Sequence, residues 1–242
     1  MSVGDQSAPR TLREERTPSP MRKTIAKRLR ESYREAVHVT VSREVDARAL
    51  AAAADAADVS VIDALVRALS DALTDHPAFN ATFEDGTHRL YEEQNVGVAV
   101  AIDDGLVAPV IADVGTRNLD DIAAERERLT EAVQSGDYAM ADLRGGTFTV
   151  SNLGPLGVDG FTPIINPPEV AILGVNRIRE RARPPGAERG SAGDGPETDD
   201  GVVFRETLPL DLSFDHRIVD GADAARFLGT LTERIEDAEE YV

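Results

Sequence analysis

Hydrophobic and polar residues alternate near the C-terminus of the chain. Between residues 208 and 215, apolar side chains occupy every second position, which predicts a half-buried strand. From residue 224 onwards, apolar residues recur at helical spacing and predict an amphipathic helix: Ala224, Phe227, Leu228, Leu231 and Ile235. His216 and Asp220 therefore lie at a predicted strand-to-helix junction, where a scaffold can hold functional side chains rigidly.

The same periodicities predict the elements of the remaining chain. Helices are expected over residues 21–36, 47–57 and 60–73, and from Asn118 to near Gly136. Strands are expected over residues 37–45, 96–102, 106–112, 147–153 and 170–175. A turn at residues 103–105 joins two of these strands into a predicted hairpin. The second half of the chain is therefore expected to be rich in strands.

Two segments lack such periodicity. Residues 1–17 are polar and predict a flexible N-terminal arm. Residues 184–201 are mainly Pro, Gly, Asp and Glu, a composition typical of an exposed acidic loop. Residues 18–242 show no internal repeat and no clear domain boundary, and by length alone the chain can form one large domain as readily as two small ones.

Composition narrows the classes of partner and site. The net charge of −18 argues against nucleic acid or an anionic membrane as the main partner. No apolar run reaches the roughly 18 residues of a membrane span, and residues 1–6 lack a secretory pattern, so we expect a cytoplasmic protein. The absence of cysteine excludes disulfides, thiolate metal sites and a covalent thiol intermediate on the protein itself.

Lysine is scarce in this acidic chain. Lys23 and Lys27 are its only lysines, and small apolar residues such as the alanine run 51–54 are common. These features are typical of a protein from a salt-loving microbe, and an ordinary acidic cytoplasmic protein is the alternative. In the halophilic case, molar salt would screen the repulsion among the carboxylates.

His216 is the first candidate for chemistry. Histidine accepts and returns protons near neutral pH, Asp220 can orient or support it, and Gly221 relaxes the backbone of the turn. Taken alone, this pattern is weak, because a single histidine beside a strand end is more often a structural residue.

A second block of sequence strengthens the case. It comprises residues 145–154 (GGTFTVSNLG) and 161–174 (FTPIINPPEVAILG). Together with residues 215–222 (DHRIVDGA), it resembles the catalytic domain of dihydrolipoamide acyltransferases, the core components of 2-oxo acid dehydrogenase complexes. Residues 21–26 (MRKTIA) and 106–111 (LVAPVI) extend the resemblance towards the N-terminus.

The resemblance implies an α/β fold of the chloramphenicol acetyltransferase type, a two-layer mixed β-sheet covered by helices. It implies a homotrimer that can build a larger cage, and acyl exchange between a dihydrolipoyl thiol and coenzyme A without a metal. By position, His216 matches the general base, Asp220 its acidic partner and Ser151 the donor to the oxyanion, whereas Asn152 is expected to contact coenzyme A.

One departure from the family pattern concerns the lipoyl group. Full-length members carry lipoyl domains and a subunit-binding domain ahead of this region, and we expect neither in this chain. No lysine follows Lys27, so the lipoyl group is expected on a separate domain or protein. The expected partners are this lipoyl-bearing protein and the other subunits of a dehydrogenase complex. Two alternatives stay open: coenzyme A-dependent acyl transfer to a small-molecule hydroxyl, and a catalytically silent scaffold core.

Overall fold

A computed structural model describes residue 8 and residues 10–183 and 202–242 of the chain. Its main feature is a seven-stranded mixed sheet with the order β1-β11-β9-β8-β4-β7, in which β10 also pairs with β11. The strands of this sheet are β1 (His38–Asp46), β4 (Val96–Val98), β7 (Val110–Ile111), β8 (Phe148–Asn152), β9 (Ala171–Val175), β10 (Arg179–Arg183) and β11 (Val203–Asp215). The pairs β4/β8 and β8/β9 are parallel, and the other pairs are antiparallel.

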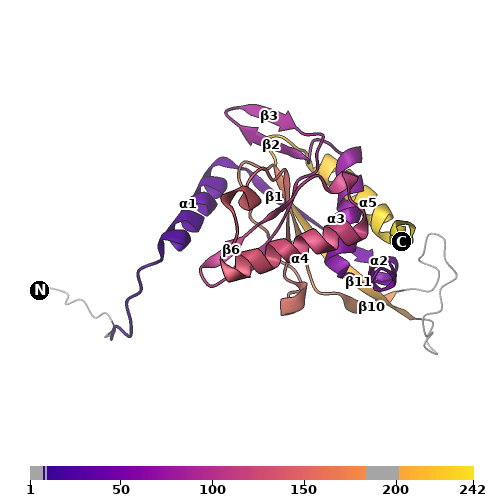
Figure 1. Ribbon diagram of the computed structural model, residues 1–242, viewed down its shortest axis with the longest axis horizontal. Coiled ribbons are helices and arrows are strands. Elements are labelled where there is room, and N and C mark those ends of the chain that lie inside the picture. The colour runs from indigo at the N-terminus through magenta and orange to yellow at the C-terminus, as the bar shows by residue number, and fades with distance from the viewer. Residues whose placement is uncertain (1–7, 9, 184–201) are drawn as a thin grey trace, which may run out of the picture.

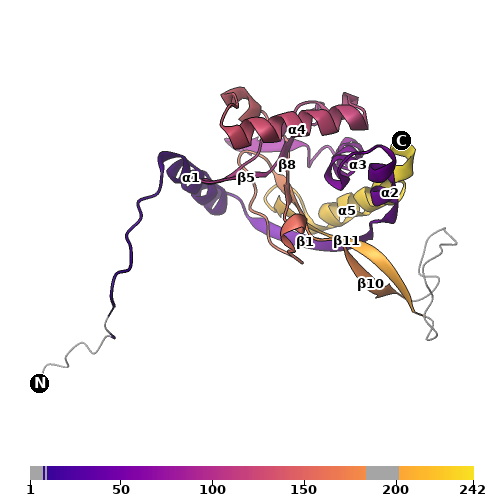
Figure 2. The same cartoon turned by 60° about the horizontal axis from the view of Figure 1, so that its bottom comes forward.

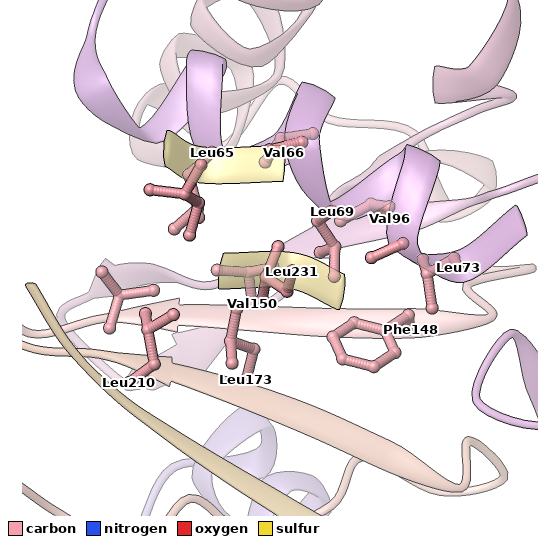
Figure 3. Packing of buried hydrophobic residues seen from close by; sticks show 14 of the residues in the cluster. Leu65, Val66, Leu69, Leu73, Val96, Phe148, Val150, Leu173, Leu210 and Leu231 are labelled. Atoms are coloured by element: carbon pink, nitrogen blue, oxygen red, sulfur yellow. The ribbon is translucent and has the colours of Figure 1, made fainter. Parts of the chain in front are cut away.

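Helices α2 (Arg48–Ala56), α3 (Val61–Asp75), α4 (Leu119–Ser135) and α5 (Gly221–Glu236) cover one face of this sheet, and α1 (Pro20–Glu35) lies at its margin (Figures 1 and 2). Figure 3 shows Leu65 and Leu69 of α3 above Phe148 and Val150 of β8, where they form part of one continuous apolar core. No helix in the described ranges is long and apolar enough to cross a membrane.

The opposite face of the sheet is polar and yet largely buried. Thr149, Ser151, Asp211 and Ser213 alternate with core residues on β8 and β11, and none is more than 7% exposed. Their polar groups are paired within this face: Ser42 Oγ donates to Asp211 Oδ1 over 2.5 Å, and the hydroxyls of Thr40 and Ser213 lie 2.7 Å apart. The period of two along each strand therefore sorts apolar residues to one face and polar residues to the other.

Helix α1 lies at the margin of the domain, next to the first residues of β1 (Figures 1 and 2). Its contacts with the loop before β9 are polar: Ser32 Oγ donates to the carbonyl oxygen of Ile165 over 2.6 Å, and Arg28 donates to that of Pro167 over 3.0 Å. Tyr33 on the same helix is exposed.

The elements expected from periodicity are present, and most of their observed ends lie within one or two residues of the expected ends. Asn118 caps α4 by accepting from the backbone N–H of Asp121, and Gly136 ends that helix with a positive φ of 83°. Each of the two strands expected in the hairpin is broken into two short strands. The inner pair, β5 (Val100–Ile102) and β6 (Gly105–Val107), forms a separate two-stranded sheet, whereas the outer pair, β4 and β7, belongs to the main sheet.

Three strands were not expected from the sequence. They are β2 (Ala81–Glu84), β3 (Thr87–Leu90) and β10. The expected acidic loop at residues 184–201 and residues 1–7 and 9 of the expected arm lie outside the described residues, and residues 10–19 contain neither helix nor strand.

Candidate active site

His216 follows the last residue of β11 and precedes α5, as the sequence predicts. Its backbone N–H donates to the carbonyl oxygen of Val37 over 2.9 Å, which fixes the main chain at this point. The ring lies 5.7 Å from that of Phe214, and the side chain is 40% exposed. A histidine held by its backbone with an accessible ring can exchange a proton with a bound thiol.

Asp215 and Arg217 form an ion pair on either side of His216. Arg217 donates from Nε (3.0 Å) and from its Nη2 (2.6 Å) to the Asp215 carboxylate, which also accepts from the backbone N–H of Val37 over 3.1 Å. Burial opposes ionisation of Asp215, but the hydrogen bonds from Arg217 and Val37 hold its pKa below the ordinary value. This pair stiffens the turn that carries the histidine. The pair was not among the predicted site residues, although two opposite charges on either side of a candidate histidine are a signal visible in the sequence.

Asp220 lies close to His216 without a hydrogen bond to it. The distance from His216 Nδ1 to Asp220 Oδ1 is 3.7 Å, beyond hydrogen-bond range, and the Asp220 side chain is 79% exposed. Its backbone provides the N-cap of α5. At this distance and exposure, the carboxylate acts on the histidine through a screened charge interaction.

Ser151 lies on the polar face of β8 and is 7% exposed. It is paired with Gly174 of β9, and a Cβ at that glycine would lie 2.9 Å from the ring of Phe161. Only glycine at this position leaves room for Phe161 to pack over the sheet beside the serine.

Asn152 follows Ser151 and borders a pocket of about 310 Å³. The pocket lies between the end of β8, the first turn of α3 and the segment after β9, and Arg177 lines it as well. Asn152 Oδ1 accepts from the backbone N–H of Gly154 over 2.9 Å, so the side chain is oriented by its own loop. Ser151 and Asn152 are the last two residues of β8, so both candidate residues lie on a rigid strand end.

The structure does not bring Ser151 and His216 together within one chain. Ser151 of β8 is paired with Gly174 of β9, and Gly174 is paired with Asp211 of β11. Asp211 precedes His216 by five residues, so Ser151 and His216 are offset by five residues along the strand direction. At about 3.3 Å per residue and about 4.8 Å per strand, the two Cα atoms are roughly 19 Å apart. One thioester carbonyl cannot touch both side chains of the same chain.

Glu169 is a buried ionisable group that the sequence analysis missed. It is 6% exposed and accepts hydrogen bonds from Thr149 Oγ1 over 2.6 Å and from Asn166 Nδ2 over 2.9 Å. Burial raises the pKa of its carboxyl group to about 7, because these neutral donors only partly offset the loss of water. No group of three or more potential metal ligands occurs in the described ranges of the chain.

Comparison with known proteins first identifies the fold. A solved chloramphenicol acetyltransferase covers 88% of this chain and 93% of its own, with a TM-score of 0.55 and 15% identity. This likeness confirms the expected fold and, at such low identity, shows the fold alone.

The family follows from a closer match. Residues 12–242 match the model of the 2-oxoacid dehydrogenases acyltransferase (catalytic domain), and the chain belongs to this family. The resemblance expected from the three sequence blocks is therefore confirmed.

A curated relative shows how much of such a protein the chain represents. The succinyltransferase component of a 2-oxoglutarate dehydrogenase complex from Bartonella vinsonii is 36% identical over 243 residues, covering 96% of this chain. The chain spans 56% of the length of that relative.

Two solved structures of higher similarity bear on the site. One, of dihydrolipoamide acetyltransferase from Azotobacter vinelandii, comes from a study of a serine, a histidine and an asparagine in its catalytic mechanism. It has a TM-score of 0.81 and 33% identity, with 94% of this chain and 93% of the other covered. The other is the cubic core of a pyruvate dehydrogenase multienzyme complex, with a TM-score of 0.82, 32% identity and the same coverage.

Proposed function

We propose that this protein transfers an acyl group between a dihydrolipoyl thiol and coenzyme A as the core of a 2-oxo acid dehydrogenase complex. The observation that carries the proposal is an accessible, backbone-fixed histidine at the end of β11 combined with a serine on the polar face of β8. Family membership and the named activities of the relatives support the same chemistry.

His216 acts as the general base. A thiol has a pKa of about 8.5 and a histidine one of about 6.5, so a neutral imidazole is available at neutral pH. Moving the proton from thiol to imidazole costs about 2.7 kcal/mol, which positioning of the two groups must offset in the transition state. The thiolate then attacks the thioester carbonyl, and the leaving thiolate recovers the proton from the imidazolium.

Ser151 donates a hydrogen bond to the oxyanion of the tetrahedral intermediate. Loss of one such donor typically lowers turnover by roughly 100- to 1000-fold. Asp220 supports the imidazolium electrostatically, and Asn152 contacts coenzyme A from the mouth of the neighbouring pocket.

We place the active site between two chains of a homotrimer, with His216 from one chain facing Ser151 of the next. The support is the separation of roughly 19 Å between these residues along the sheet of a single chain. The cubic core among the solved relatives supports assembly of such trimers into a larger cage. The lipoyl group is carried by a separate domain or protein, since no lysine follows Lys27.

The setting that we propose is the cytoplasm of a salt-adapted cell. The net charge of −18 and the scarcity of lysine support adaptation to salt. No metal ion takes part in the proposed steps.

An acyl-transfer assay tests this function. The purified protein is given acetyl, succinyl and branched-chain thioesters of coenzyme A with free dihydrolipoamide, across a range of salt concentrations. We expect transfer of at least one acyl group and a loss of about 100-fold or more in His216→Ala, with His88→Ala on the β2–β3 hairpin as the matched control. Transfer to chloramphenicol instead of dihydrolipoamide would favour the hydroxyl-directed alternative, and no transfer at all would favour a silent scaffold.

A further inference from the structure

We propose that Phe83 of the β2–β3 hairpin is a positioning residue for the general base. Its ring holds Arg217 against Asp215 and so fixes the turn that carries His216. This inference rests on the proposed function and adds to it a residue outside the sequence blocks that carry the family resemblance. It begins from the place of the hairpin beside that turn.

Main-chain hydrogen bonds place β2 beside the end of β11. The backbone N–H of Phe83 donates to the carbonyl oxygen of Pro168 over 2.8 Å. The backbone N–H of Val170 donates to Ala81 over 3.2 Å, and its carbonyl oxygen accepts from the N–H of Asp215 over 2.9 Å. One stretch of backbone therefore separates the hairpin from the start of the turn.

The ring of Phe83 faces a guanidinium group. The central carbon of the Arg217 guanidinium lies over this ring, 4.8 Å from its centre, and a cation is attracted to an aromatic face within about 6 Å. Both side chains also line a cavity of about 30 Å³ together with Glu35 of α1, whose charge attracts Arg217. Because space remains beside the guanidinium, contact with the ring rather than close packing on every side determines where it lies.

The position of the guanidinium reaches His216 through two further residues. Arg217 donates from Nε and Nη2 to the carboxylate of Asp215, whose side chain is 3% exposed. The same carboxylate accepts from the backbone N–H of Val37, and the carbonyl oxygen of Val37 accepts from the N–H of His216. A buried carboxylate that loses its charged partner is strongly destabilised, so a shift of Arg217 would displace Asp215 and the backbone attached to it. The ring of Phe83 thus acts on the base through Arg217 and Asp215.

A simpler role for Phe83 would be to cover the edge of the core, against which it packs. The two roles make different demands on the side chain at this position. Covering the core needs apolar volume, which leucine supplies nearly as well as phenylalanine. Holding a guanidinium needs an aromatic face, which tyrosine and tryptophan keep and leucine lacks. Substitutions of this one residue therefore separate the two roles.

Three variants of the full chain test the proposal: Phe83→Leu, Phe83→Tyr and Phe83→Trp. The kcat and the KM values for the coenzyme A thioester and dihydrolipoamide are measured. We expect Phe83→Leu to lower kcat about 10-fold with both KM values within about twofold of the parent, and the aromatic variants to keep kcat within about threefold. In an Arg217→Gln background, Phe83→Leu should cause no further loss, because the ring no longer has a cation to hold.

Two controls match these variants. Phe204→Leu changes another phenylalanine, which is 44% exposed on β11, and should leave kcat unchanged. His88 lies opposite Phe83 on β3, and its Nε2 is 3.2 Å from the carbonyl oxygen of Ala78. His88→Ala therefore leaves the contact between Phe83 and Arg217 in place and should also leave kcat unchanged.

The parent kcat in Phe83→Leu would overturn the proposal, as would equal losses in all three variants or an undiminished loss in the Arg217→Gln background. Hydrogen exchange of the backbone amides of residues 212–220 keeps the proposal separate from the proposed function. We expect these amides to exchange about 10-fold faster in Phe83→Leu than in the parent protein. Faster exchange in a protein that transfers no acyl group would refute the proposed function alone, whereas acyl transfer with unchanged exchange and kcat would refute this inference alone.

Discussion

His216, directly after β11, is offset from Ser151 of β8 by about five residues along the strand direction, and β9 lies between the two strands. The parallel pairing of β8 with β9 and the antiparallel pairing of β9 with β11 set this offset. Because Ser151 is on a regular strand and His216 directly follows one, no small rotamer change closes a gap of roughly 19 Å. The proposed chemistry therefore requires a second copy of the chain.

The buried Glu169 predicts a pH-dependent loss of stability. Its pKa is raised to about 7, so the stability linked to its neutral form is full below the ordinary value of 4.5 and is lost as the pH rises through about 7. Glu169→Gln should therefore flatten the fall in unfolding free energy between pH 5 and pH 8 by on the order of 3 kcal/mol. Urea denaturation at both pH values measures this difference, with the exposed Glu127→Gln as control. The same pH dependence in Glu169→Gln and the parent protein would mean that Glu169 is ionised in the folded state.

A buried ion pair anchors α4 to α3. Arg126 Nε lies 2.5 Å from Oδ1 of Asp63, whose side chain is 0% exposed and which also accepts from the backbone N–H of Ser60. Arg126→Ala leaves a buried carboxylate without its partner and should lower the unfolding free energy by roughly 3 kcal/mol or more. Arg128→Ala removes a more exposed pair with Glu125 and should cost less than about 1 kcal/mol. Equal losses in the two variants, measured by denaturant titration, would contradict this account.

We expect Asp220 to tolerate loss of its charge better than loss of its side chain. The carboxylate is 79% exposed and 3.7 Å from the histidine, so screening limits its charge interaction. The acetyltransferase from Azotobacter vinelandii was studied with an asparagine four residues after its histidine, the same spacing as from His216 to Asp220. We predict that Asp220→Asn keeps turnover within about threefold of the parent protein and that Asp220→Ala loses more. A loss of about 100-fold in Asp220→Asn would instead assign the charge an essential role.

Salt should stabilise the folded chain. At a net charge of −18, the carboxylates repel one another in the compact state, and this repulsion is screened over a few ångströms at molar ionic strength. We therefore expect the melting temperature to rise from low to molar sodium chloride. Sodium chloride and potassium chloride should act alike if screening is the cause. A melting temperature that is flat or falls would contradict adaptation to salt.

The sequence predicted the fold wherever a single period ran through an element. The apolar positions of α5 are buried as predicted. The strand before His216 is present, but the prediction that it is half-buried is wrong: residues 207–215 are buried on both faces, because the polar residues of β11 pair with β1 and with the loop before β9. Strand β10 escaped prediction because its residues are Arg, Glu and Ala, and its pairing with β11 rather than burial makes it a strand. The hairpin of β2 and β3 was missed for a similar reason, since most of β3 is exposed.

For the site, the sequence predicted residues but no distances. The strand-to-helix junction of His216 was predictable from periodicity alone, whereas the offset from Ser151 depends on which strands pair and in which register. The hydrogen bonds of Glu169 to Thr149 and Asn166 also arise only in three dimensions, when the loop before β9 folds over β8. Register and loop packing are long-range properties that no local pattern encodes.

The shared active site is tested most directly by complementation between two inactive variants. Ser151→Ala and His216→Ala are purified separately, dissociated and reassembled as a mixture, with exchange of subunits followed by a mass tag. A site that receives His216 from a Ser151→Ala chain and Ser151 from a His216→Ala chain has both side chains. We predict that the mixture regains a sizeable fraction of the parent turnover, while each variant reassembled alone regains none. Confirmed exchange of subunits without any return of activity would show that both residues act within one chain and would contradict the account.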